Sequence, residues 1–98
     1  MLVEPISLED QPISKECIGA NDYVMKVHDH VVGRVVARRV TGGRVVWMWM
    51  LTGIHLPIQL QPSHGAAKVE ADAEAALRSK FDAWLSWVRE RGTPVEIA

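Results

Sequence analysis

Between residues 23 and 52, the chain has the hydrophobic pattern of β-strands. Valine dominates this stretch, proline does not occur in it, and short turn signals divide it. The pattern predicts three strands, at about residues 23–28, 31–40 and 44–52. Asp29-His30 and Gly42-Gly43 suit the two hairpin turns, because these residue types tolerate positive φ angles.

Two-residue turns would place Val24 opposite Val35 and Arg38 opposite Trp47. The resulting tryptophan face carries Tyr23, Met25, Val27, Val32, Val36, Val40, Val45, Trp47, Trp49 and Leu51, with Arg34 and Arg38 among them. The resulting valine face carries Val24, Val31, Gly33, Val35, Ala37, Val46, Met48 and Met50, with Lys26, His28 and Arg39 among them. A three-residue loop at residues 41–43 would instead turn the third strand over relative to the second.

Beyond residue 52 the pattern changes from strands to a loop and then a helix. Glycine and proline recur between residues 53 and 65, which predicts a loop. From about Lys68 onward, apolar residues recur at spacings of three and four, as on one face of an amphipathic helix. Acidic residues in the first turns, Arg89 and Arg91 in the last, and the following Gly92-Thr93-Pro94 all favour a helix that ends near Arg91.

These elements predict an α+β fold: a three-stranded antiparallel β-meander followed by one long C-terminal helix that packs on one face of the sheet. We expect residues 21–98 to form this single βββα domain. Pro5 and Pro12 disfavour regular structure in residues 1–20. That segment is expected to be an N-terminal arm, which either remains flexible or docks, for instance as an edge strand.

Composition narrows the class of protein. The chain has 98 residues, one cysteine, 48% hydrophobic residues and a net charge of −1, which is ordinary for one globular domain and excludes a disulfide scaffold. The longest apolar run has seven residues, Val45–Leu51, whereas a membrane span needs about 20. The N-terminus does not resemble a signal peptide, so we expect a cytoplasmic location.

No catalytic or cofactor motif is visible, and we therefore expect neither enzyme activity nor a cofactor. His28 and His30, with His55 and His64 elsewhere, could supply imidazole ligands, but no Cys pair or His-Glu helix motif completes a metal site. Cys17 is expected to be a free surface thiol.

A single helix can cover only one face of a sheet, yet both faces here carry large apolar residues. A second copy of the chain, the N-terminal arm or a ligand must cover the other face. We therefore expect a small non-catalytic module for self-association or for binding another, unidentified protein. Of these we favour a homodimer, since symmetric pairing is the commonest way for small chains to bury such a surface. The candidate interface residues are Trp47, Trp49, Leu51, Tyr23 and Met25.

The alternative function is nucleic-acid binding by the same face. In the register of two-residue turns, Arg38 lies opposite Trp47 and Arg34 lies near Trp49. Arginines interleaved with aromatic rings form platforms on which bases stack. Arg34, Arg38, Trp47 and Trp49 are the candidate residues, although the net charge of −1 suits a buried interface better.

Three features together resemble a family of small, uncharacterised proteobacterial proteins: the Trp47-Met48-Trp49 strand, the His64-Gly65-Ala66 segment and the helix with Glu74-Ala75, Phe81 and Trp84. The family shares a Trp-x-Trp strand, a Gly-x-Ala turn and a C-terminal amphipathic helix, and the resemblance covers residues 23–87. It implies the βββα order and no particular chemistry. The chain departs from the family in having His30 at the first hairpin and a longer loop before the helix.

Overall fold

The computed structural model describes residues 2–3, 13–27, 29–91 and 95–96. Five strands form one antiparallel sheet in the order β2-β3-β4-β5-β6. Their bounds are β2 Ser14–Gly19, β3 Asp22–Val27, β4 His30–Arg39, β5 Val45–Leu51 and β6 His64–Ala67. A 3-10 turn, η1 (Ile58–Leu60), lies between β5 and β6, and helix α2 (Glu70–Arg91) follows. Two short strands near the chain ends, β1 (Leu2–Val3) and β7 (Val95–Glu96), pair antiparallel with each other.

The predicted α+β class, with an antiparallel sheet and one C-terminal helix, is confirmed, but the core has five strands rather than three. Both added strands lie at edges of the sheet. Residues 14–19 of the expected arm form β2, so this part of the arm docks as an edge strand. The expected loop and Gly-x-Ala turn contain β6, which pairs with β5 through Trp49 and Gly65. The first of these strands is one of the two alternatives that the sequence left open for the arm. The second was missed, because a short edge strand need not show a period of two.

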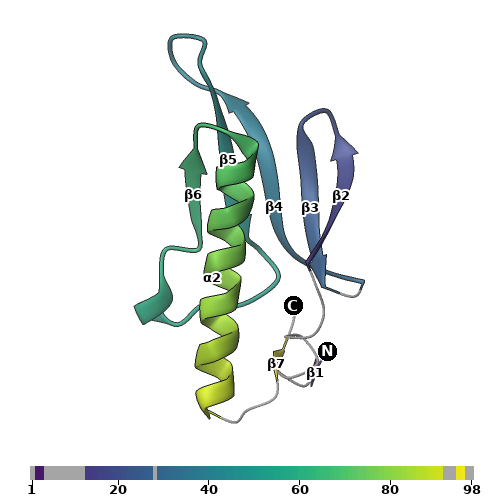
Figure 1. Cartoon of the computed structure of the whole chain (residues 1–98), viewed down its shortest axis with the longest axis vertical. Coiled ribbons are helices and arrows are strands. Elements are labelled where there is room, and N and C mark those ends of the chain that lie inside the picture. The colour runs from purple at the N-terminus through teal and green to yellow at the C-terminus, as the bar shows by residue number, and fades with distance from the viewer. Residues whose placement is uncertain (1, 4–12, 28, 92–94, 97–98) are drawn as a thin grey trace.

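Helix α2 packs across β4, β5 and β6 and leaves β2 and β3 to one side (Figure 1). Its predicted apolar stripe is buried at Ala73, Leu77, Phe81, Trp84, Leu85 and Val88. Glu70 and Asp72 in the first turn and Arg89 and Arg91 in the last complement the helix dipole as expected. The predicted stop signal at residues 92–94 lies outside the described residues.

The register of β4 is the main correction to the sequence analysis. Ala37, not Arg38, lies opposite Trp47, and Arg34, not Val35, lies opposite Val24. In the second hairpin the cause is a three-residue loop, since Val40 and Arg44 pair across residues 41–43 and the amide of Gly43 donates to the carbonyl of Val40 at 3.0 Å. Gly42 and Gly43 have φ angles of 88° and 78°, which favour glycine.

In the first hairpin, Val27 lies opposite His30, two residues earlier than the expected partner Val32. A bulge at Val32 then reduces the shift to one residue, so that Met25 lies opposite Gly33. Each hairpin thus departs from the expected register. Because both shifts are of one residue, β3 and β5 keep the faces expected for them relative to each other. Only β4 presents its side chains to the opposite faces.

The face of the sheet that contacts α2, here called the helix face, therefore contains Lys15, Tyr23, Met25, Gly33, Val35, Ala37, Trp47, Trp49, Leu51, Gly65 and Ala67. Gly33 allows α2 to pack close to β4, because a Cβ at this position would lie only 2.7 Å from Leu77 Cδ1 of the helix. Val27, Val32, Val35, Leu77 and Phe81 are fully buried in this core.

Candidate functional site

The five candidate interface residues do lie on one face, but that face is the one under the helix. Met25, Trp49 and Leu51 are buried in the hydrophobic core with α2. Tyr23 and Trp47 are half-buried and stack on each other, with ring centroids 6.4 Å apart. These residues stabilise the fold, and the surface left for a partner must be sought elsewhere.

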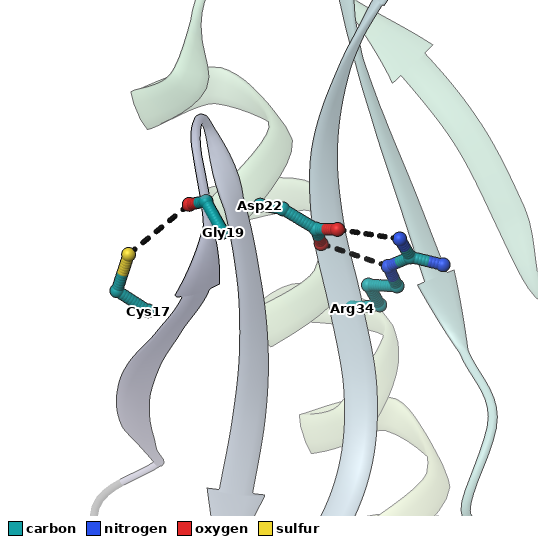
Figure 2. Close-up of polar contacts among 4 residues, drawn as sticks. All are labelled: Cys17, Gly19, Asp22 and Arg34. Carbon is teal, nitrogen blue, oxygen red and sulfur yellow. Dashed lines mark hydrogen bonds and ion pairs between the residues drawn. The ribbon is translucent and has the colours of Figure 1, made fainter.

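The four candidate nucleic-acid residues do not come together. Trp47 and Trp49 face the helix, whereas Arg34 and Arg38 extend from the opposite face of β4. Arg34 donates two hydrogen bonds to the carboxylate of Asp22, at 2.8 and 2.5 Å (Figure 2). The stacking of guanidinium groups on the two indoles, on which that alternative rested, is therefore not formed.

The opposite side of the sheet, here called the outer face, is apolar at its centre. Val36 is 7% exposed and is buried, although it is not part of the core under the helix. Four half-buried side chains from the two neighbouring strands, β3 and β5, lie around it: Val24, Val46, Met48 and Met50. No helix or strand of the described residues covers this face (Figure 1).

Two ion pairs lie on the outer face, and their residues come from β2, β3 and the central strand β4. Besides the Asp22–Arg34 pair, Lys26 forms an ion pair with Glu16 across β2 and β3. Hydrogen bonding by Arg34 lowers the pKa of Asp22 below its ordinary value of 3.8, and that by Glu16 raises the pKa of Lys26. Asp22 and Lys26 are thus charged near neutral pH, and the outer face carries charges of both signs beside its apolar residues.

A shallow groove of about 440 Å³ lies between β2, β3 and the start of α2. Ile13, Met25 and Ala75 line it together with Lys15, Glu74 and Arg78. Lys15 Nζ lies 2.9 Å from Glu74 and 4.7 Å from the centre of the Tyr23 ring. The ammonium group of Lys15 thus links β2 to the helix through an ion pair. Among the residues that line the groove, every charged side chain has an ion-pair partner, and none is a nucleophile.

The remaining reactive side chains show no common centre. Cys17 is exposed, and its Sγ lies 3.1 Å from the carbonyl oxygen of Gly19 (Figure 2). Over the described part of the chain, no three His, Cys, Asp or Glu side chains gather as metal ligands would. His28 lies outside the described residues. No described helix has the length and apolar character that a membrane crossing requires.

A third surface was missed by the sequence analysis. Residues 38–45, at the tip of the β4–β5 hairpin, are all exposed, and the hairpin extends past the neighbouring elements (Figure 1). They include Arg38, Arg39 and Arg44. The signal that could have revealed this surface is a run of 40 residues, 30–69, without Asp or Glu.

Comparison with known proteins adds no functional assignment: no protein-family model, curated protein or solved structure matches this chain. The resemblance to small proteobacterial proteins therefore stays a prediction.

Proposed function

We propose that this protein is a non-catalytic self-association module that forms a homodimer through the outer face of its sheet. The observation that carries the proposal is the uncovered apolar centre made by Val24, Val36, Val46, Met48 and Met50. A solvated sheet face normally alternates to polar residues. A contiguous apolar patch bordered by polar groups is typical of a surface that binds another protein.

The border of the patch favours a second copy as the partner. In a two-fold symmetric interface, each patch meets itself, so the charges must be self-complementary. Glu16 and Asp22 supply negative groups, and Lys26 and Arg34 supply positive groups, on the same face, with Arg34 lying between Val24 and Met50. Rotation by a two-fold axis can bring the acids of one copy toward the bases of the other, whereas a border of one sign would repel its copy.

The size of the face sets the expected affinity. Five strands about 4.8 Å apart and about 20 Å long give roughly 500 Å² per copy, or about 1,000 Å² for both. That total lies at the lower end of specific interfaces. We therefore expect a reversible dimer with a dissociation constant in roughly the micromolar range.

The test is light scattering behind size-exclusion chromatography at several loading concentrations. The wild type should rise from the 10.9 kDa of one chain toward twice that mass as concentration increases. Met48→Glu should remain at the mass of one chain, because it places a carboxylate in the centre of the interface. Circular dichroism on the same samples checks that the variant is folded.

Ile58→Glu is the matched control, since Ile58 is 88% exposed on η1, away from the outer face. It should dimerise like the wild type. A wild type that stays monomeric at all concentrations would overturn the proposal. So would a dimer that Met48→Glu leaves intact and Trp47→Glu disrupts without unfolding, because this result would return the interface to the Trp47 side of the sheet.

A further inference from the structure

The arginines at the tip of the β4–β5 hairpin differ from four other basic residues of the chain. Lys15, Lys26, Arg34 and Arg78 each form an ion pair with a carboxylate. Arg38, Arg39 and Arg44 form no such pair with any described acid. The contact within the hairpin is a hydrogen bond from Arg39 Nη1 to the carbonyl of Gly43, at 3.5 Å, which is a weak distance. Three exposed cations thus lie at the tip without an ion pair to a described carboxylate.

The surroundings of the tip keep its positive charge from being neutralised. Residues 30–69 contain Arg34, Arg38, Arg39, Arg44 and Lys68 and no Asp or Glu. The acidic side chains nearest in the sheet belong to β2 and β3, and Asp22 there is already held by Arg34. The net charge of −1 therefore conceals a positive pole at one end of the molecule.

The arrangement of the arginines selects the kind of partner. Arg38 lies on the outer face of β4, and Arg39 lies on the helix face, beyond the region that α2 covers. A flat anionic surface, such as a membrane or an acidic protein, would be met by cations on one side of the ribbon. Cations on both faces of the β-ribbon instead match a groove that carries negative charge on both of its walls.

We propose that the β4–β5 hairpin is an arm that enters the major groove of double-stranded DNA, with its arginines contacting phosphates on both walls. The major groove of B-form DNA, about 12 Å wide, admits a two-stranded β-ribbon, whereas that of A-form RNA is too narrow. Gly42 and Gly43 make the tip small enough to approach the base edges. Val40 and Val45, 36% and 47% exposed, can contact thymine methyl groups. This proposal does not depend on dimerisation through the outer face.

The experiment is fluorescence anisotropy with a labelled DNA duplex and an A-form RNA duplex, each at salt concentrations from about 50 to about 200 mM. The triple variant Arg38→Gln/Arg39→Gln/Arg44→Gln is compared with Arg78→Gln/Lys80→Gln/Arg89→Gln on α2. The two variants carry the same net charge. The wild type and the α2 variant should both bind the DNA duplex, and their affinity should fall steeply as the salt concentration rises.

The hairpin variant should lose at least about tenfold in affinity at low salt, and its salt slope should fall by about 3, one for each lost phosphate contact. An equal loss in both variants would show that total charge alone governs binding, and would overturn the proposal. Tighter binding of the RNA duplex would also overturn it, as would a wild type that binds neither duplex at low salt. Unchanged circular dichroism in both variants ensures that the comparison concerns folded protein.

Discussion

Along β5, the two faces of the sheet are equally apolar in sequence and unequally covered in the structure. Along β5, Trp47, Trp49 and Leu51 alternate with Val46, Met48 and Met50. Trp49 and Leu51 are part of the hydrophobic core under α2, and Trp47 packs against that core. Val46, Met48 and Met50 belong to the outer face, over which no described helix or strand lies. Hydrophobicity along a strand therefore indicates which residues favour burial. The elements that pack on the strand determine which of these residues stabilise the monomer.

The helix face also has a shape requirement that the outer face lacks. Gly33 and Gly65 both lie where a larger residue would collide, with Leu77 in one case and with the indole of Trp49 in the other. The outer face carries ion pairs instead, at Asp22–Arg34 and Glu16–Lys26. The helix face is therefore defined by close packing against α2 and within the sheet, whereas the outer face combines apolar residues with ion pairs.

The largest expected effect separates two adjacent residues of β5. Trp49→Ala should lower the free energy of unfolding by about 3–5 kcal/mol, because it empties a core position that is 8% exposed. Met48→Ala, on the outer face, should cost about 1 kcal/mol or less. Urea denaturation at a protein concentration low enough to keep the chain monomeric measures both. Equal losses would mean that the two faces are buried alike.

An intermediate effect is expected at the glycine beneath Trp49. A Cβ at Gly65 would lie 2.7 Å from Nε1 and 2.9 Å from Cε2 of that indole, so Gly65→Ala must displace the ring. We expect a loss of about 1–3 kcal/mol in thermal or urea unfolding, together with a change in tryptophan fluorescence.

Gly19→Ala is the matched control for this substitution. Its Cβ would meet only Asp22 Cβ, at the ordinary contact distance of 3.7 Å. The change should be neutral or slightly stabilising, because alanine restricts the unfolded chain. If the two alanine variants were equally stable, Trp49 would not be packed on β6 as described.

The smallest effect concerns the border of the outer face. The hydrogen bonds and charge of Arg34 lower the pKa of Asp22 in the folded state. Its contribution to stability is therefore present above pH 3.8 and is lost as the pH falls through the lower, folded-state pKa. Asp22→Asn should be less stable than the wild type near pH 7, and this difference should shrink in acid.

The measurement is the urea midpoint of both proteins between about pH 7 and about pH 2. Asp29→Asn, which removes an exposed carboxylate from the first hairpin, serves as the control and should not reproduce the convergence. A difference between wild type and Asp22→Asn that stays constant with pH would argue against a stabilising Asp22–Arg34 pair.

Strong local patterns in the sequence were enough to predict helix α2 and the three central strands. Helix α2 was predicted to within two residues at its start, because one apolar stripe, acidic first turns and basic last turns agree with one another. The three central strands were predicted because valine-rich segments between turn residues favour extended backbone. The grouping of Tyr23, Met25, Trp47, Trp49 and Leu51 on one face also followed from the period of two, helped by two register errors that cancelled.

The edge strands, the register of β4 and the position of α2 depend on contacts between segments that lie far apart in the sequence. The edge strands β2 and β6 form because a neighbouring strand offers unpaired backbone groups, which no local pattern records. The register of β4 depends on one extra residue in a turn and on the bulge at Val32, so Arg34 and Arg38 changed faces. The choice of face for α2 followed from shape, since Gly33 and Gly65 leave space on one side for Leu77 and Trp49. Sequence patterns state what each residue prefers, and long-range packing determines which preferences are met.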